Sequence, residues 1–272
     1  MGYDLSILMP AIRSEKWLGV YESVEKAFSG TWELIVISSK PLPPELDEKE
    51  NVNYVYSDRS PAQKQQQGLC EAEGDWVTSM SDDSIWLPGT IDKAFEVVRD
   101  LPYRHFAVLK YLEGQYTEYP PYHQARWGWK TNYEFMRDDK YYLCHTHDSS
   151  SFPGIPENTP VISVAFISRK ILVKIGGWDC KFQTLAMANV DLAVRLMKAK
   201  CKYTIVDLVV QVCGWMPGKD GDHKPVHDAQ TLDDEPLIEQ MYSTNDFEDR
   251  VEIDLANWKE TEPVWKRLSG SC

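Results

Sequence analysis

The chain has 272 residues, 43% of them hydrophobic, and a formal net charge of −13 from 29 basic and 42 acidic side chains. This negative charge argues against non-specific binding to nucleic acid or to an anionic membrane. No apolar run reaches about 18 residues, so we expect no membrane span. The apolar run that begins at residue 5 leaves no room for a signal peptide, and the six cysteines form no C-x-x-C pair. Both features favour a cytoplasmic protein with reduced thiols.

The first hundred residues alternate between apolar runs and amphipathic segments, a pattern typical of an α/β domain with parallel crossovers. Ser60 is a favourable N-cap for the third expected helix, and Pro61 suits the first helical position. Expected strands cover residues 5–9, 32–37, 52–56 and 76–80, and expected helices cover residues 16–28, 61–72 and 90–100.

Two adjacent carboxylates, Asp82 and Asp83, follow the fourth expected strand. Neighbouring negative charges raise one another's pKa unless a cation lies between them. Mg²⁺ and Mn²⁺ favour carboxylate oxygens together with substrate phosphates, and open α/β sheets bind ligands at the carboxyl ends of their strands. The pair therefore predicts a metal–phosphate site, while a solvated turn that caps the next helix is the competing interpretation.

The second half of the chain is less regular. Residues 101–159 hold thirteen tyrosines, tryptophans and phenylalanines among loops and short strands, consistent with an acceptor-binding lid or with a covering flap. Residues 161–168 and 202–212 predict strands. Residues 169–175 predict a short helix that ends at a Gly-Gly pair, and a second helix is expected to begin at about Asn189.

Several segments, in this order, resemble the inverting family 2 glycosyltransferases, which have the GT-A fold. The resemblance covers most of residues 5–213. Its segments are residues 6–13, residues 33–37, residues 59–68, Ser81-Asp82-Asp83, Gly176-Gly177-Trp178-Asp179 and residues 189–196. It implies one GT-A domain over residues 1–272, with a mixed, mostly parallel sheet flanked by helices. Residues 1–100 would form the nucleotide-sugar half, residues 101–213 the acceptor-binding and catalytic half, and residues 214–272 a C-terminal extension.

The resemblance also implies a reaction, in which a nucleotide-diphosphate sugar donates its sugar to an acceptor hydroxyl with inversion. Mn²⁺ or Mg²⁺ would offset the charge of the departing diphosphate, and a carboxylate would remove the hydroxyl proton. Asp83 would ligate the metal, and Asp82 would contact the metal or the ribose. The implied nucleotide pocket is lined by Pro10, Ala11, Arg13 and Lys64. We expect a nucleotide sugar and a glycan or glycoconjugate as partners.

Two positions depart from the family's pattern. The second strand ends in Ser38-Ser39 instead of acidic residues that read the base, so Asp58 is a candidate for this role and the donor stays open between UDP- and GDP-linked sugars. The expected catalytic base falls on Asn189, whose amide cannot act as a base at neutral pH. Asp191 is the leading replacement, unless Asn189 is simply an N-cap and Asp191 a first-turn residue. Asp179 and an acceptor-assisted mechanism are further options.

His223 and His227 have the i, i+4 spacing of a metal pair on a helix, but Pro225 between them argues against a helix. His223 is the candidate third metal ligand. A non-enzymatic function competes with catalysis, because Asn189 and Ser38 also fit a module that binds nucleotide or glycan without turnover. A nucleotidyltransferase is less favoured, since residues 9–13 are not a Gly-rich phosphate loop.

Overall fold

The computed structural model describes residues 2–113, 162–213, 224–243 and 250–261, with short pieces at 130–131, 134–135, 142–144, 147–148, 155–156 and 159–160. Most of the aromatic segment and His223 lie outside the described residues, as does the C-terminal stretch around Trp265. The expectations of an acceptor lid and of a histidine metal ligand therefore stay predictions.

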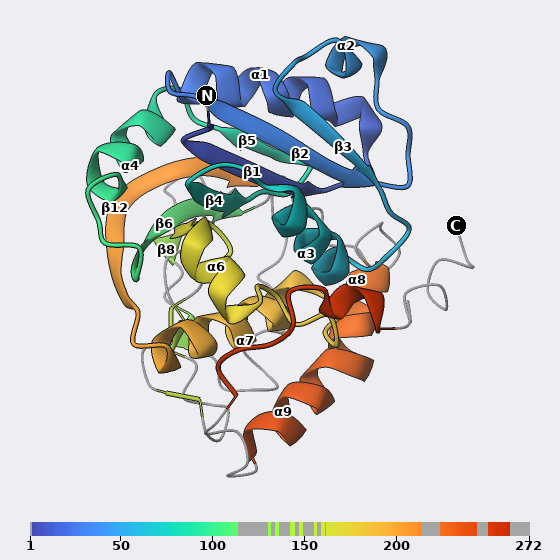
Figure 1. Ribbon diagram of the computed structural model, residues 1–272, viewed down its shortest axis with the longest axis vertical. Helices are drawn as coiled ribbons and strands as arrows, with labels where there is room; N and C mark the ends of the chain where they lie inside the picture. The colour runs from blue at the N-terminus through green and yellow to red at the C-terminus, as the bar shows by residue number, and fades with distance from the viewer. Residues whose placement is uncertain are drawn as a thin grey trace.

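A mixed, curled sheet forms the centre of the molecule, with helices on both faces (Figure 1). Its strands run in the order β3-β2-β1-β4-β11-β6-β12-β5. The first four are parallel to one another, β11 is antiparallel to both of its neighbours, and β6 is parallel to β12. The strands are β1 (Leu5–Pro10), β2 (Trp32–Ser38), β3 (Val52–Tyr56), β4 (Trp76–Ser79), β5 (Ser84–Trp86), β6 (His105–Glu113), β11 (Ala165–Ser168) and β12 (Lys202–Cys213).

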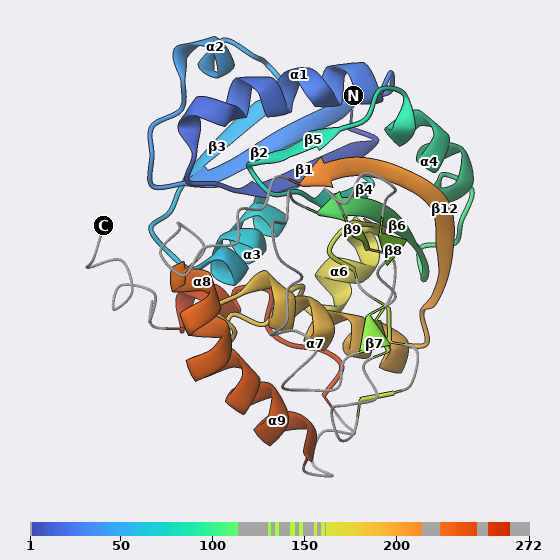
Figure 2. The same ribbon diagram turned by 180° about the vertical axis from the view of Figure 1, so that it is seen from behind.

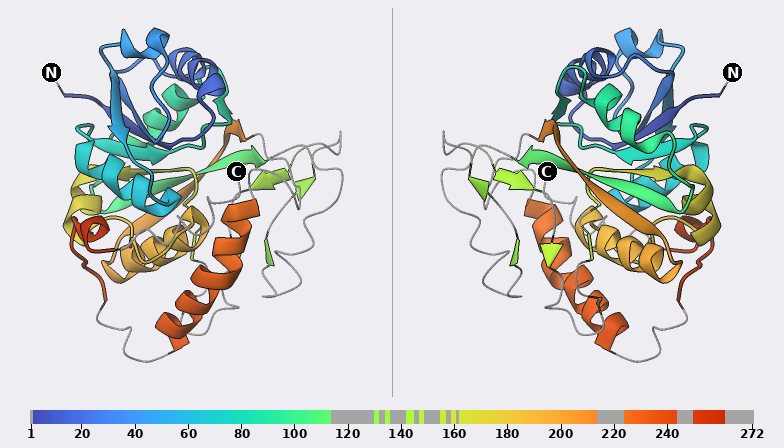
Figure 3. Two further views of the ribbon diagram at one scale, coloured as in Figure 1. Left: turned by 90° about the vertical axis from the view of Figure 1, so that its right-hand side faces the viewer. Right: turned by 90° about the vertical axis from the view of Figure 1, so that its left-hand side faces the viewer.

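Short strands extend this arrangement beyond the central sheet. Strand β9 (Tyr142–Cys144) pairs with β6 and with β8 (Glu134–Phe135), while β7 (Lys130–Thr131) and β10 (His147–Asp148) form a separate two-stranded sheet. Figure 2 shows the long, curved β12 from behind, and Figure 3 shows the short strands standing apart from the helical layers. The predicted strands and helices of the first hundred residues are confirmed to within two residues at most ends.

Strand β1 explains why its apolar run is nearly continuous. Ile7 and Met9 belong to the core under α1 (Trp17–Ala27), α2 (Pro44–Asp47) and α4 (Thr90–Val98). Leu8 belongs to the core on the opposite face, under α3 (Pro61–Glu71), α6 (Arg169–Ile175) and α7 (Leu185–Lys198). A strand with helices on both faces needs apolar side chains in both directions. Of the helices in the described ranges, none combines the length and apolar character needed to cross a bilayer.

Two glycines let α6 end against the rest of the molecule. Gly176 and Gly177 have φ angles of 85° and 69°, in the left-handed region that favours glycine. A Cβ at Gly176 would collide with the backbone of Ile253, and one at Gly177 would collide with the side chain of Gln66. Positive φ and close approach together require glycine at both positions, as the Gly-Gly pair after the helix predicts.

The described part of the C-terminal extension belongs to the main core. Helix α9 (Glu235–Ser243) packs on α7, and its Ile238 and Tyr242 are buried with the α7 side chains. Residues 250–261, which contain the short 3₁₀ helix Asn257–Lys259, run back over α6 and α3. The expectation that Pro225 excludes a helix is wrong, because Pro225 lies in the first turn of α8 (Lys224–Ala229), where it blocks no intrahelical hydrogen bond. A π-helical turn, Gln230–Asp234, joins α8 to α9.

Candidate functional site

The parallel strands bring the predicted nucleotide-binding segments to one edge of the sheet. Pro10 pairs in register with Ile37, one residue before the end of β2. On the other side of β1 lies β4, and the Asp82–Asp83 pair follows it. Carboxyl ends of neighbouring parallel strands meet at the same edge, where open α/β sheets bind their ligands. The fold therefore gathers Pro10, Ser38 and the Asp82–Asp83 pair, as the sequence predicts.

Asp82 holds the loop between β1 and α1. Its Oδ2 atom accepts hydrogen bonds from the backbone N–H of Ile12 at 2.7 Å and of Arg13 at 2.6 Å, and from the Trp17 indole at 3.4 Å. Its Oδ1 atom accepts from the Arg13 guanidinium. Three of these four donors share Oδ2, and the fourth, a guanidinium, occupies Oδ1. Asp82 therefore fixes the loop and, as placed, does not fit the predicted role of a metal ligand.

Asp83 has a different environment. Its Oδ1 atom accepts from the Ser81 hydroxyl, and its Oδ2 atom lies 3.8 Å from Nη1 of Arg13. The Arg13 guanidinium thus lies beside both carboxylates, in the place where a cation between them is expected. No cluster of three His, Cys, Asp or Glu side chains suited to a metal occurs within the described ranges. Of the predicted metal ligands, Asp83 is the one whose surroundings fit a cation best.

Lys64 reaches the same loop from the opposite side. It lies in the first turn of α3, is 4% exposed, and donates from Nζ to the backbone carbonyl of Ala11 at 3.3 Å. Burial lowers its pKa to about 8, against the opposing effect of the negative charges of Asp82 and Asp58. Among the described residues, the partners of this buried cation are a carbonyl and more distant carboxylates, which leaves it well suited to meet an incoming anion.

The two residues considered for base recognition differ in exposure. Ser38 is fully buried, and its hydroxyl accepts a hydrogen bond from the backbone N–H of Lys40 at 3.0 Å. Its carbonyl accepts from the N–H of Ser57, which brings the chain next to Asp58 to the end of β2. Asp58 is exposed. The geometry therefore leaves Asp58, more than Ser38, able to contact a bound base.

On the acceptor side, Asn189 is held by a tryptophan. Helix α7 begins at Leu185 with Thr184 as its N-cap, so the interpretation of Asn189 as an N-cap is wrong. Asn189 instead lies in the second turn, 6% exposed, and its Oδ1 atom accepts from Nε1 of Trp178 at 2.8 Å. Asp191 lies two residues further along the helix, roughly 200° around its axis. The two side chains therefore point in different directions, and Asp191 cannot take the place of Asn189.

Asp191 is the centre of a buried ion-pair network. It is completely buried, and its Oδ2 atom accepts from Nε of Arg195 at 2.8 Å, one helical turn away. Its Oδ1 atom accepts from the Tyr242 hydroxyl at 3.0 Å and from Nη1 of Arg250 at 2.9 Å. Burial, followed by the negative charge of Asp191, raises the pKa of Tyr242. These partners favour a structural function for Asp191 over the predicted function of general base.

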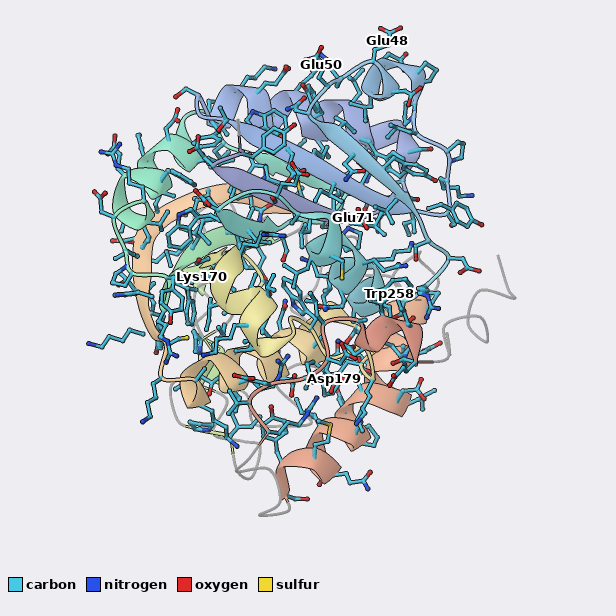
Figure 4. The ribbon with its side chains drawn as sticks, viewed as in Figure 1. Glu48, Glu50, Glu71, Lys170, Asp179 and Trp258 are labelled. Atoms are coloured by element: carbon cyan, nitrogen blue, oxygen red, sulfur yellow. The ribbon has the colours of Figure 1, made fainter. Side chains whose placement is uncertain are left out.

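Asp179, the other candidate base, belongs to the same network. It is buried, pairs with Nη2 of Arg250, and accepts from the backbone N–H of Lys181 at 2.9 Å. Figure 4 labels Asp179 beside the C-terminal segment that supplies Arg250. Arg250 therefore joins the carboxylates of Asp179 and Asp191, and burial lowers its pKa to about 10.

Two residues that sequence patterns did not single out connect the halves of the molecule. Gln66 of α3 accepts from the backbone N–H of Trp178 at 2.7 Å and donates to the carbonyls of Gly176 and Leu255. Asp234 accepts from the backbone N–H groups at the start of α7 and from the Thr184 hydroxyl at 2.6 Å. Burial raises its pKa to about 6. The run of glutamines in a helix was a visible signal for Gln66, whereas Asp234 caps a helix 50 residues away in sequence.

Known structures share this fold, although no family profile and no curated protein matches the sequence. The chain superposes on Staphylococcus aureus TarS 1–349 with a TM-score of 0.53 at 12% identity, covering 78% of this chain and 60% of that one. With TarS 1–349 in complex with UDP, the TM-score is 0.54 at 12% identity, covering 97% and 91%. With the UDP-GlcNAc complex it is 0.54 at 12% identity, covering 91% and 72%.

This likeness confirms the predicted α/β class, a mixed sheet flanked by helices, and supports a GT-A-like fold. At 12% identity it concerns the fold alone, and the chain spans three fifths of one TarS structure. The roles of individual residues follow from the geometry of this chain.

Proposed function

We propose that this chain is a glycosyltransferase that moves a sugar from a nucleotide-diphosphate sugar to an acceptor hydroxyl, with inversion at the anomeric carbon. The observation that carries the proposal is the clamp of Asp82 on the β1–α1 loop, with Lys64 and Arg13 beside it at the carboxyl edge of the sheet. The TarS structures of the same fold include complexes with UDP and UDP-GlcNAc, which favours a UDP-linked donor over a GDP-linked one.

The residues at this edge have complementary tasks in the proposed reaction. The clamped loop presents a fixed backbone surface, and Lys64 and Arg13 supply positive charge next to it. During transfer, the bond from the anomeric carbon to the diphosphate oxygen breaks and negative charge develops on the leaving group. Fixed cations stabilise that charge most effectively where water is excluded, as it is around the buried Lys64.

Metal dependence forms part of the proposal and rests on Asp83. When bound, a divalent cation would neutralise charge on the diphosphate. Asp83 is the side chain that would hold it, since Asp82 already accepts hydrogen bonds from four N–H donors. Because Arg13 lies 3.8 Å from Asp83, a bound cation and Arg13 would compete for the same carboxylate. His223 remains the proposed additional ligand.

Thermal unfolding in the presence of UDP, GDP, CMP or TDP, each with and without Mn²⁺, tests the donor site. A ligand at 100 times its dissociation constant adds about 2.7 kcal/mol to the free energy of unfolding. We expect a higher melting temperature with UDP, enhanced by Mn²⁺ and lost in Asp83→Ala. The exposed Asp47→Asn change is the matched control. No shift with any nucleotide would remove the donor-site assignment.

A binding module without turnover is the second candidate function. Asn189 favours it, because the amide at the predicted base position accepts no proton and both nearby carboxylates are held by Arg250. Release of UDP from UDP-sugars above the uncatalysed background distinguishes the two candidates. NMR of the sugar product then reports whether the anomeric configuration is inverted.

A further inference from the structure

Three segments of the chain bring basic side chains together at one end of the sheet. They are residues 99–104 between α4 and β6, residues 169–174 of α6, and residues 199–202 between α7 and β12. These segments carry seven basic side chains and one acidic side chain, in a chain whose net charge is −13. The basic patch, as we call this group, consists of Arg99, Arg104, Arg169, Lys170, Lys174, Lys200 and Lys202.

Hydrogen bonds and a ring contact make the three segments neighbours in space. Nη1 of Arg104 donates to the carbonyl of Ala199 at 3.0 Å, and the backbone N–H of Lys202 donates to the carbonyl of Arg104 at 2.9 Å. Nζ of Lys170 lies 4.6 Å from the centre of the Tyr103 ring. Figure 1 shows α6, the start of β12 and the loop after α4 on the same side of the molecule, and Figure 4 labels Lys170 there.

Most charges of the basic patch face water. Its exposed side chains are those of Arg99, Lys170, Lys174, Lys200 and Lys202. The acidic residue of the three segments, Asp100, is also exposed and lies 3.8 Å from Arg99. Exposed charges more than about 8 Å apart are largely screened at physiological ionic strength. The negative charge of the chain as a whole therefore does not cancel the positive potential at this surface.

An exposed aromatic ring lies within the basic patch. Tyr103 is 37% exposed and follows Pro102, which is also exposed. The Tyr103 hydroxyl accepts from Nε of Arg104 at 3.1 Å. This hydrogen bond, followed by the positive charges of Arg104, Lys174 and Lys170, lowers the pKa of Tyr103. A tyrosine surrounded by long basic side chains combines apolar surface, a polar tip and positive charge, which suits the headgroup region of a bilayer.

We propose that the basic patch docks the protein on membrane surfaces that contain anionic lipids. Clustered basic side chains are attracted to negative headgroups, and the Tyr103 ring adds contact with the boundary between headgroups and acyl chains. Nucleic acid is contacted mainly through its phosphates, so it would use the charges of the patch and leave the apolar surface of Tyr103 in water. Docking of this kind is independent of the proposed sugar transfer.

The position of the basic patch sets the orientation of the docked protein. Strands β4 and β6 run in the same direction, because both are antiparallel to β11. The basic patch lies at the amino ends of β6 and β12, whereas the Asp82–Asp83 pair follows the carboxyl end of β4. The nine residues of β6 span about 30 Å between these two ends. A bilayer at the basic patch therefore leaves the proposed donor edge open to nucleotides in solution.

Sedimentation with lipid vesicles tests the docking surface. The full chain is mixed with vesicles of equal parts phosphatidylcholine and phosphatidylglycerol, with vesicles of phosphatidylcholine alone, and with buffer. We expect the protein to pellet only with the anionic vesicles. Its affinity for them should fall at least tenfold when the salt concentration rises from about 0.05 M to about 0.5 M.

Matched charge reversals locate the surface. Lys170→Glu/Lys202→Glu alters two exposed residues of the basic patch, and Lys26→Glu/Lys181→Glu alters two exposed residues elsewhere with the same change in net charge. The first pair should weaken vesicle binding at least tenfold, and the second pair less than twofold. Residue 170 lies in the first turn of α6, where the helix dipole favours a glutamate. Melting temperatures are compared to confirm that both variants fold.

Tyr103→Ala separates a bilayer from other polyanions. This variant should weaken vesicle binding at least threefold and leave its salt dependence unchanged, because apolar contact is lost and charge is not. Duplex DNA, added at the same phosphate concentration as the anionic lipid, should displace less than half of the bound protein. Unchanged binding by Tyr103→Ala, or displacement of most of the protein by DNA, would overturn the proposal in favour of a nucleic-acid surface.

Three further results would contradict membrane docking. They are an absence of pelleting with anionic vesicles at low salt, pelleting in buffer alone, and equal losses of binding in the two charge-reversal pairs. The thermal shift with UDP is recorded for every protein and should be the same in all of them. Its absence from the wild type would count against the donor site and leave the membrane result unaffected.

Discussion

Asp82 and Asp191 are both buried, and each accepts a hydrogen bond from an arginine, yet their remaining partners differ. Asp82 accepts mainly from backbone N–H groups of a loop at the sheet edge. Asp191 accepts from side chains that come from α7, α9 and the C-terminal segment. The first carboxylate shapes a loop where a ligand is expected, and the second fastens together parts of the core. These two buried aspartates therefore differ in function because different groups donate hydrogen bonds to them.

The arginines make the same distinction. Arg13 is 12% exposed and lies between Asp82 and Asp83, so it can turn toward a bound anion. Arg195 is completely buried and also donates to the carbonyls of Ile175 and Gly177. A cation with so many fixed acceptors cannot move without leaving buried groups unpaired. The arginine that can change partners, Arg13, thus lies at the sheet edge where the nucleotide sugar is proposed to bind. The arginine that is fixed by its partners, Arg195, lies in the buried network of α7.

Removal of Asp191 should have the largest effect. Asp191→Ala leaves Arg195 buried without a counter-charge, and breaking a buried pair in this way typically destabilises by about 3–5 kcal/mol. Urea unfolding should show a free energy of unfolding that is lower by about this amount. The exposed Glu239→Ala variant of α9 should leave the free energy of unfolding nearly unchanged. A variant that keeps wild-type stability but loses sugar transfer would instead identify Asp191 as the general base.

Asp82→Ala should destabilise less than Asp191→Ala but should weaken donor binding. The N–H groups of Ile12 and Arg13 lose their acceptor, at about 1–3 kcal/mol for each buried donor left unpaired, less where water reaches the loop. UDP affinity, measured by calorimetry, should fall at least tenfold because the loop is no longer held. Asp83→Ala, the matched control, should preserve stability in the absence of Mn²⁺. Equal losses of stability in the two variants would contradict the assignment of loop fixation to Asp82 and of cation binding to Asp83.

Lys64→Met should raise stability while weakening donor binding. Burial depresses the folded-state pKa of Lys64 from 10.5 to about 8, so the charged form destabilises the folded state at pH 7. Wild-type stability should rise as the pH increases from about 8 to 10.5, where the unfolded chain binds the additional proton. At pH 7 the free energy of unfolding of the variant should exceed that of the wild type by about 1–3 kcal/mol. The rise of stability between pH 8 and 10.5 should be absent from the variant. The exposed Lys26→Met serves as control, and an unchanged UDP affinity would rule out the anion-binding role.

The smallest effect should come from Asp234, the cap of α7. Because burial raises its pKa from 3.8 to about 6, the protonated form is favoured in the folded state. Its contribution to stability is complete below about pH 4 and is lost as the pH rises through 6. This contribution amounts to about 1–2 kcal/mol between those limits. Melting temperatures from pH 4 to 8 should show the slope in wild type and in Glu239→Gln, but not in Asp234→Asn. If the melting temperature of Asp234→Asn still fell between pH 4 and 8, the pH dependence would belong to another titratable group.

The donor half was more predictable than the acceptor half for a physical reason. Strand periodicity, the Ser60–Pro61 helix start and the glycines after α6 are local signals, and each one decides a backbone conformation nearby. Placement of Asp191 depended on where α7 begins, and that helix starts four residues before Asn189 with a cap supplied by Asp234. No local pattern reports such a cap. Pro225 was misjudged because a proline breaks a helix only beyond its first turn.

By itself, the sequence determined the alternation of strands and helices, the edge at which Pro10 and the Asp82–Asp83 pair meet, and the absence of a carboxylate at Asn189. These follow from periodicity, parallel connection and residue chemistry. Only the tertiary structure decided which carboxylates are held by hydrogen bonds and ion pairs. The partners of Asp82 lie about 70 residues away in sequence, and those of Asp191 lie up to 59 residues away. Burial removes water as an alternative partner, so the donors that folding brings to each carboxylate decide its function.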